Sequence, residues 1–182
     1  IWTVEDITAS REHRERLAWT SSHDSLTGLP NRPAFEALLA RATDRAASVP
    51  FCAMFIDLDR FKQVNDTGGH AAGDALLRDV AHTLAAQVRQ TDTVARLGGD
   101  EFAIYLGSCP LAQALEIGEK LRSTVEAYRL PWEGHSFSVT TSIGLVAVDG
   151  SYTTVADVLR AADAACYAAK EKGRNTVAVF DP

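Results

Sequence analysis

The feature that most constrains the fold is a run of six apolar residues, Phe51–Ile56, which ends at Asp57. A strand whose successive side chains are all apolar has both faces covered, because alternate side chains point to opposite faces of a sheet. The run is also far shorter than the roughly 20 apolar residues that a membrane-spanning helix needs. The sequence therefore predicts that residues 51–56 form a buried central strand.

Helices and further strands surround this segment. Apolar residues recur at helical spacing after Arg32 and over residues 73–88, 111–128 and 154–171. The residues at 65–69, Asn-Asp-Thr-Gly-Gly, are typical of a turn. Strands are predicted over 93–97, 102–106, 136–147 and 176–180, the first two joined by a hairpin through 98–101. We expect an α/β fold of two or three layers (α+β), with a central, mixed, mostly antiparallel five-stranded sheet flanked by helices.

The first 22 residues differ from the rest of the chain. Residues 1–8 combine apolar, β-branched and acidic residues and are expected to be extended, whereas residues 9–22 are charged and compatible with a helix. This helix has too few regularly spaced apolar residues to be buried alone, so we expect a linker helix that pairs with a second copy. The predicted organisation is the end of an upstream domain and a linker helix over 1–22, then one domain over 23–182.

Charge and cysteine content restrict the partners and the compartment. The formal net charge is −6 and no long basic run is present, which argues against binding of duplex nucleic acid. The three cysteines are widely spaced and their spacing does not suggest a zinc site. We interpret them as small core or surface residues of a protein in a reducing compartment. With no signal peptide and no membrane segment in this fragment, we expect a cytoplasmic domain, whose full-length parent could be membrane-anchored.

Asp57 and Asp100 form the candidate site. Asp57 ends the most apolar strand of the chain, where a carboxylate is costly unless a cation meets it. Asp100 lies at the tip of the predicted hairpin, next to glycines that leave room for a phosphate. Each stretch alone is most often a solvated turn, but two aspartates on neighbouring strand ends can bridge one or two Mg²⁺ ions. Such an arrangement suits phosphoryl or nucleotidyl transfer.

Several motifs then point to a family. Residues 98–102 spell Gly-Gly-Asp-Glu-Phe, a string that arises by chance about once per million positions at average residue usage. The chain resembles the GGDEF diguanylate cyclases over roughly residues 20–180. The other matching segments are His23-Asp24-Ser25-Leu26-Thr27-Gly28-Leu29-Pro30-Asn31-Arg32, Asp57-Leu58-Asp59-Arg60-Phe61-Lys62, Gly69-His70-Ala71-Ala72-Gly73-Asp74, Ser142-Ile143-Gly144, Tyr167-Ala168-Ala169-Lys170 and Gly173-Arg174-Asn175. The resemblance implies a core like that of nucleotide cyclases and polymerase palms, and condensation of two GTP molecules into cyclic di-GMP and two pyrophosphates.

The resemblance also implies a site for Mg²⁺ or Mn²⁺. The implied ligands are Asp57, the carbonyl of Leu58, Asp100 and Glu101. Asp100 and Glu101 are the implied catalytic residues. Glu101 either assists metal binding or activates the 3′-hydroxyl, and the sequence leaves both roles open.

Further matching positions are implied to hold the nucleotide. Asn65 and Asp74 match positions that read guanine, whose N1–H and N2–H can both be accepted by a carboxylate. Adenine would leave that carboxylate facing an acceptor, a mismatch that costs about 1–3 kcal/mol. Without the resemblance, Asp74 would be interpreted only as an acidic residue that favours a helix start. The implied phosphate-binding residues are Phe61 and Lys62, through backbone amides, together with Lys170 and Arg174.

Lys170 and Arg174 are four residues apart at the end of a predicted helix, so both are expected to face one way. Without the resemblance they would be interpreted as ordinary cations near a helix C-terminus.

The resemblance further implies control by assembly and by product. One site holds one GTP, so two domains must face each other for each 3′-hydroxyl to attack the α-phosphate of the other nucleotide. Arg89 and Asp92 match an RxxD inhibitory site for cyclic di-GMP, in which arginine can contact guanine O6 and N7. We expect an ion pair between Asp24 and Arg96. Residues 6–8, Asp-Ile-Thr, resemble the exit of a PAS sensory domain.

Three alternatives remain beside this interpretation. The domain could bind GTP or cyclic di-GMP without catalysis, although intact motifs argue against this. It could act structurally, relaying dimerisation to an attached phosphodiesterase domain. It could also be a related nucleotidyl cyclase with another product, which Asp74 argues against.

Overall fold

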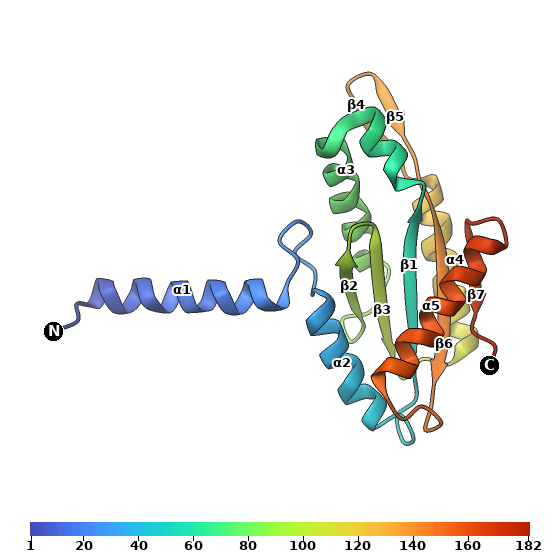
Figure 1. The fold of residues 1–182 in the computed structure, drawn as a ribbon, viewed down its shortest axis with the longest axis horizontal. Coiled ribbons are helices and arrows are strands. Elements are labelled where there is room, and N and C mark those ends of the chain that lie inside the picture. Colours follow the sequence, from blue (N-terminus) through green and yellow to red (C-terminus); the bar gives the residue numbers. More distant parts are fainter.

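The computed structural model describes residues 1–182 and contains one five-stranded sheet with helices on both faces (Figure 1). The strands are β1 (Phe51–Asp59), β2 (Thr93–Gly98), β3 (Glu101–Gly107), β6 (Thr140–Val148) and β7 (Thr176–Val179). They follow the order β2-β3-β1-β6-β7, and only the β6-β7 pair is parallel. The structure therefore confirms the predicted mixed, mostly antiparallel sheet with residues 51–56 in its central strand.

Two helices cover each face of the sheet. Their bounds are α2 (Arg32–Asp44) and α5 (Val155–Glu171) on one face, and α3 (Phe61–Ala86) and α4 (Leu111–Ala127) on the other. Alternate residues of β1 belong to the two cores: Met54 and Ile56 pack with α3 and α4, whereas Ala53 and Phe55 pack with α2 and α5. The strand is thus buried on both faces, as its unbroken apolar sequence predicts.

The N-terminal segment is a helix that projects away from the sheet (Figure 1). This helix, α1 (Val4–Ser22), has no buried residue. The helix predicted over 9–22 is confirmed, but the prediction of extended structure over 1–8 is wrong. The helix begins early because Thr3 and Asp6 form a capping box, in which each side chain accepts a hydrogen bond from the other residue's backbone N–H. No helix of the chain is long and apolar enough to cross a membrane.

Helix α3 starts earlier than predicted. The turn-like sequence at 65–69 is helical up to Gly68, and a kink follows at Gly69, whose φ is 82°. A positive φ at this position favours glycine, which has no side chain to clash with the backbone.

The strand predicted over 136–147 is interrupted. Residues at its start form β5 (His135–Phe137), which pairs with β4 (Leu130–Trp132) in a separate hairpin, and β6 begins only at Thr140. The pattern missed this hairpin because each of its strands is three residues long. The hairpin packs back on α3, since a Cβ at Gly68 would lie 2.8 Å from the ring of Phe137.

Candidate functional site

Asp57 and Asp100 lie together where β1 meets the β2-β3 hairpin. Asp57 is opposite Glu101 in the β1-β3 register, and the N–H of Leu58 donates to the carbonyl of Asp100 at 3.2 Å. Burial and the neighbouring Asp57 carboxylate raise the pKa of Asp100 to about 6. The register and this hydrogen bond fix the turn that carries Asp100 next to the end of β1, where the Asp100 carboxylate is partly desolvated beside Asp57. The pairing expected from the sequence is therefore present.

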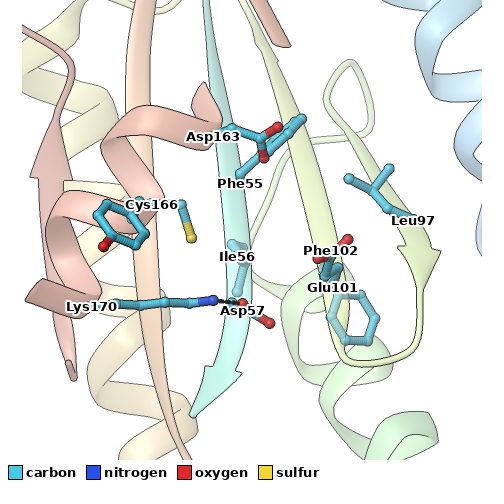
Figure 2. Close-up of a pocket in the computed structure, with 10 residues that line it drawn as sticks. Phe55, Ile56, Asp57, Leu97, Glu101, Phe102, Asp163, Cys166 and Lys170 are labelled. Carbon is cyan, nitrogen blue, oxygen red and sulfur yellow. Dashed lines mark ion pairs between the residues drawn. The ribbon is translucent and has the colours of Figure 1, made fainter. Parts of the chain in front are cut away.

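Lys170 supplies the nearest positive charge. Its ammonium, from α5, forms an ion pair with Asp57 (Figure 2). Burial lowers the pKa of Lys170, but the contact with Asp57 outweighs this and the pKa is raised. The cation that a carboxylate at the end of a buried strand requires is thus supplied by α5.

A cavity of about 280 Å³ opens beside this pair, between α5 and the hairpin (Figure 2). Its walls combine apolar and ionisable side chains. The lining residues are Phe55, Ile56, Asp57, Leu97, Glu101, Phe102, Asp163, Cys166, Tyr167 and Lys170. The cavity is large enough for part of a small ligand; the Lys170–Asp57 ion pair lies at one end, and Asp163 lies near Phe55 at the other.

Asp163 and Tyr167 are cavity residues that the sequence interpretation assigned no role. They precede Lys170 on α5 by seven and three residues, a helical spacing that puts all three on one face. Burial raises the pKa of Asp163, which the charges of Arg32 and Lys170 partly offset. The same spacing, applied backwards from Lys170, could have found both residues in the sequence.

The Glu101 side chain points toward Arg32, unlike the carboxylates of Asp57 and Asp100, which lie next to each other. Its side chain is 52% exposed and lies 3.6 Å from a guanidinium nitrogen of Arg32, at the start of α2. No group of three or more histidine, cysteine or acidic side chains is arranged to hold a metal. Two carboxylates remain adjacent at Asp57 and Asp100, beside the backbone of Leu58. Oxygen ligands of this kind, with two neighbouring negative charges, fit a divalent cation.

Asn65 and Asp74, the predicted guanine-reading residues, lie on the two sides of the kink in α3. The Asn65 side chain packs directly on Gly73, where an added Cβ would lie 1.9 Å from its Oδ1. Asp74 follows Gly73 and is exposed. The kink thus brings the Asn65 side chain next to Gly73, the residue that precedes Asp74, although seven residues lie between Asn65 and Gly73 in sequence.

The first residues of α3, Phe61 and Lys62, follow Arg60, which has a φ of 57° and makes no side-chain cap. The first backbone N–H groups of a helix have no partner within it, so this helix start can receive an anion.

The expected geometry of Lys170 and Arg174 is wrong. Helix α5 ends at Glu171, and positive φ angles follow at Gly173 (103°) and Arg174 (66°). Because the chain leaves the helix between them, the four-residue spacing does not put Lys170 and Arg174 on one helical face. Arg174 is exposed on the turn that leads into β7.

Arg89 and Asp92 bind each other at the far end of the hairpin. The guanidinium of Arg89 donates to both carboxylate oxygens of Asp92, at 2.9 and 3.0 Å. Asp92 also accepts from the N–H of Gly107, and its side chain is 0% exposed, whereas that of Arg89 is 48% exposed. Only Arg89 of this pair is therefore open to a ligand.

Asp24 and Arg96 form the expected ion pair, at 3.0 Å and largely shielded from solvent. The same guanidinium donates to the carbonyl of Gly99 at 2.7 Å. The segment after α1 is thus joined through one arginine to the turn that carries Asp100.

The sequence is similar to a known protein family and to named relatives. Residues 21–176 match the family described as "Diguanylate cyclase, GGDEF domain". The chain is 42% identical over 184 residues to "Probable diguanylate cyclase DgcE" of Escherichia coli (strain K12), covering 100% of this chain and 17% of DgcE. It is 40% identical over 171 residues to "Diguanylate cyclase TpbB" of Pseudomonas aeruginosa (strain UCBPP-PA14), covering 91% of this chain and 39% of TpbB. The chain thus spans less than half the length of these curated relatives.

A solved structure agrees with the fold. The coiled coil and GGDEF domain of DgcB from Caulobacter crescentus, in complex with c-di-GMP, superposes with a TM-score of 0.88 at 31% identity. The match covers 96% of this chain and 94% of that one. Diguanylate cyclases with GGDEF domains generally depend on a divalent metal.

Proposed function

The chain belongs to the GGDEF family of diguanylate cyclase domains, and on that premise we propose that it condenses two GTP molecules into cyclic di-GMP, releasing two pyrophosphates. The observation that carries this proposal is the adjacent pair Asp57 and Asp100, with Lys170 beside it and the family's motif intact. We further propose that residues 1–22 are the end of an upstream, PAS-like sensory domain with its linker helix, and that 23–182 are the cyclase domain. The chain acts in the cytoplasm in this proposal, within a longer signalling protein.

We propose Mg²⁺, or Mn²⁺, as the metal. Asp57, the Leu58 carbonyl and Asp100 would hold it, and Glu101 could join them if its side chain left Arg32. A bound divalent ion would neutralise charge that develops on the phosphates. Glu101 alternatively activates the attacking 3′-hydroxyl, for which its exposed position beside Asp57 is suited.

The nucleotide would lie across α3. Asp74 accepts from guanine N1–H and N2–H, and Asn65 contacts the base from the other side of the kink. Binding of ATP is disfavoured because adenine would leave the Asp74 carboxylate without a hydrogen-bond donor. The triphosphate of the nucleotide is bound by the backbone amides of Phe61 and Lys62 and by the cationic side chains of Lys170 and Arg174.

Two copies complete the reaction. Each 3′-hydroxyl attacks the α-phosphorus of the other nucleotide, forms the new ester bond and expels pyrophosphate, so both sites must face each other. The projecting helix α1 supports this proposal because its apolar side chains Ile7, Leu17 and Trp19 stay exposed in a single copy. A homodimer held by two such helices would bring the sites together, and DgcB of known structure contains a coiled coil.

Cyclic di-GMP would also inhibit the enzyme at the RxxD site. Arg89 is the residue that would contact guanine O6 and N7, while Asp92 holds it in place. Binding of the product would then hold two domains apart or in an unproductive arrangement.

The alternative is a silent sensor of GTP or cyclic di-GMP. Incubation of purified protein with GTP and Mg²⁺, followed by chromatography, separates the two. We expect one cyclic di-GMP and two pyrophosphates per two GTP from the wild type, and neither product from Asp100→Asn. Tight GTP binding without product formation by the wild type would instead favour the sensor.

A further inference from the structure

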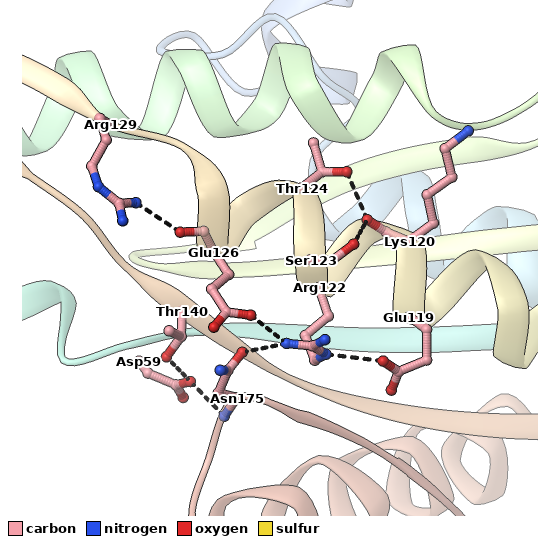
Figure 3. Close-up of polar contacts among 10 residues, drawn as sticks. All are labelled: Asp59, Glu119, Lys120, Arg122, Ser123, Thr124, Glu126, Arg129, Thr140 and Asn175. Carbon is pink, nitrogen blue, oxygen red and sulfur yellow. Dashed lines mark hydrogen bonds and ion pairs between the residues drawn. The ribbon is translucent and has the colours of Figure 1, made fainter.

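Asp59 is a buried carboxylate close to the site with no part in the proposed chemistry. It lies at the end of β1, two residues beyond Asp57, and is 7% exposed. Its oxygens accept hydrogen bonds from the hydroxyls of Thr140 and Ser142, both at 2.7 Å, and from the N–H of Asn175 at 3.0 Å (Figure 3). A buried carboxylate with three donors is well satisfied, and removing it would leave those donors unpaired.

The Asp59 contacts join two segments that are distant in sequence. On one side, Asp59 directly precedes Arg60, where the chain turns into the start of α3. On the other side, the N–H that it accepts belongs to the peptide between Arg174 and Asn175. One carboxylate therefore holds the start of α3 and the turn that carries Arg174 in a fixed relation.

Arg122 of α4 holds the same turn from outside (Figure 3). Its guanidinium, 20% exposed, donates to Oδ1 of Asn175 at 2.9 Å and to Glu119 and Glu126 at 3.0 and 2.6 Å. Hydrogen bonds from Arg122 and Asn175 lower the pKa of Glu126. Asn175 is thus bound through its backbone to Asp59 and through its side chain to α4.

The turn needs such support because its backbone conformation is unfavourable by itself. Arg174 and Asn175 have φ angles of 66° and 47°, a region that side-chain-bearing residues rarely occupy. Consecutive residues in this region persist where surrounding contacts determine them. The direction of the Arg174 side chain therefore depends on the contacts of Asn175.

We propose that Asp59 and Arg122 are positioning residues, which fix the Arg174 turn so that Arg174 and the first amides of α3 reach the same triphosphate. This inference rests on the proposed function, in which both segments bind phosphate. It predicts that loss of Arg122 weakens recognition of the outer phosphates and leaves recognition of the base intact.

The test compares two nucleotides on the dimer-competent full chain. Binding of a non-hydrolysable GTP analogue with Mg²⁺, and of GMP, is measured by calorimetry for the wild type, Arg122→Met and Arg122→Lys. We expect Arg122→Met to bind the analogue about 10-fold more weakly, the effect of one lost hydrogen bond, and GMP within about 2-fold of the wild type. Arg122→Lys restores part of the loss. Glu119→Gln is the matched control, because it removes one ion pair of Arg122 without touching Asn175.

A double variant tests whether Arg122 acts through Arg174. We expect Arg122→Met combined with Arg174→Ala to bind the analogue no more weakly than Arg174→Ala alone. Additive losses, equal weakening of both nucleotides, or an unchanged Arg122→Met would each overturn the positioning role. A wild type that binds neither nucleotide contradicts the proposed function itself, and the inference with it. Asp59→Asn, examined the same way, tests the inner contact, while Arg122→Met keeps the test valid should Asp59→Asn not fold.

Discussion

The ammonium of Lys170, on α5, is paired with the carboxylate of Asp57, on β1, at the rim of the cavity beside Asp100. The positive charge that we assign to triphosphate binding thus lies against a proposed metal ligand. We propose that Lys170 exchanges Asp57 for a phosphate of the nucleotide, since a divalent ion held by Asp57 would compete with the ammonium for this carboxylate.

Lys170→Met tests this exchange. Without the ammonium the triphosphate loses one charge-assisted contact, so we expect affinity for the GTP analogue to fall by about 10-fold or more. Affinity for Mn²⁺ alone should stay equal or improve, because no cation then competes for Asp57. Calorimetry with each ligand measures both. Weaker Mn²⁺ binding together with unchanged nucleotide binding would contradict the proposed role.

Asp100→Asn is expected to abolish product formation while it stabilises the fold. Burial and Asp57 raise the pKa of Asp100 to about 6 in the folded chain, above its ordinary value. The protonated form therefore favours folding, and this contribution is lost as the pH rises through about 6. At pH 7.5 without metal, the neutral asparagine should stabilise the fold by about 1 kcal/mol after allowance for solvent screening, or roughly 2–4 °C.

Thermal unfolding in EDTA at pH 7.5 and pH 4.5 measures this effect. The gain from Asp100→Asn should shrink at the lower pH, where the wild-type carboxyl is already protonated in the fold. A variant that is less stable than the wild type at both pH values would show that Asp100 is not electrostatically strained.

Arg96→Met should break the connection between Asp24, which follows α1, and the turn that carries Asp100. It removes the ion pair with Asp24 and the bonds to the Gly99 carbonyl, so we expect a loss of about 1–3 kcal/mol in unfolding free energy and a lower rate of product formation. Burial raises the pKa of Asp24, but hydrogen bonds from Thr27 and Arg96 together outweigh it, so the pKa is lowered. The stabilising contribution of Asp24 is therefore present above its ordinary pKa, and the difference between wild type and variant should diminish as the pH falls below about 4.

Denaturant titrations at pH 7 and pH 3.5 give this comparison. Arg41→Met, an exchange of an exposed arginine on α2, serves as the control. Equal destabilisation by both exchanges would argue against a specific role for the Asp24–Arg96 pair.

Arg89→Ala and Asp92→Ala should differ, although both alter the RxxD motif. Arg89 is exposed, so its loss should raise the concentration of cyclic di-GMP needed for half-inhibition by about 10-fold or more and leave the fold intact. Asp92 is buried and, besides the Arg89 guanidinium, accepts from the backbone N–H groups of Arg89 and Gly107, so its loss should cost about 2–3 kcal/mol of stability. Inhibition assays and thermal unfolding measure the two effects. Unchanged inhibition of Arg89→Ala would remove the proposed product site.

The parts of the fold that local pattern determines were predictable from the sequence. The unbroken apolar run at 51–56 requires cover on both faces, and the glycines before Asp100 require a turn. Both expectations are confirmed. The pairing of Asp57 with Asp100 follows from these two features, because antiparallel neighbours bring a strand end to a hairpin turn.

Other features depend on contacts that no local pattern reveals. The departure of Arg174 from the helix follows from positive φ angles at residues 173–175, which Asp59 and Arg122 support from distant segments. The spacing from Lys170 indicates the helix face of Asp163, but only the packing of α5 on the sheet shows that this face lines a cavity. The helical start at Val4 was a local feature that was missed: Thr3 and Asp6 have the spacing of a capping box.

The most direct test of a shared metal site is a Mn²⁺ titration followed by electron paramagnetic resonance, in the presence of the GTP analogue. We expect Asp57→Asn and Asp100→Asn each to weaken Mn²⁺ binding by at least about 10-fold relative to the wild type, and Asp163→Asn, from the same cavity, to bind as the wild type does. Mn²⁺ binding that is unchanged in both Asp57→Asn and Asp100→Asn would contradict the site.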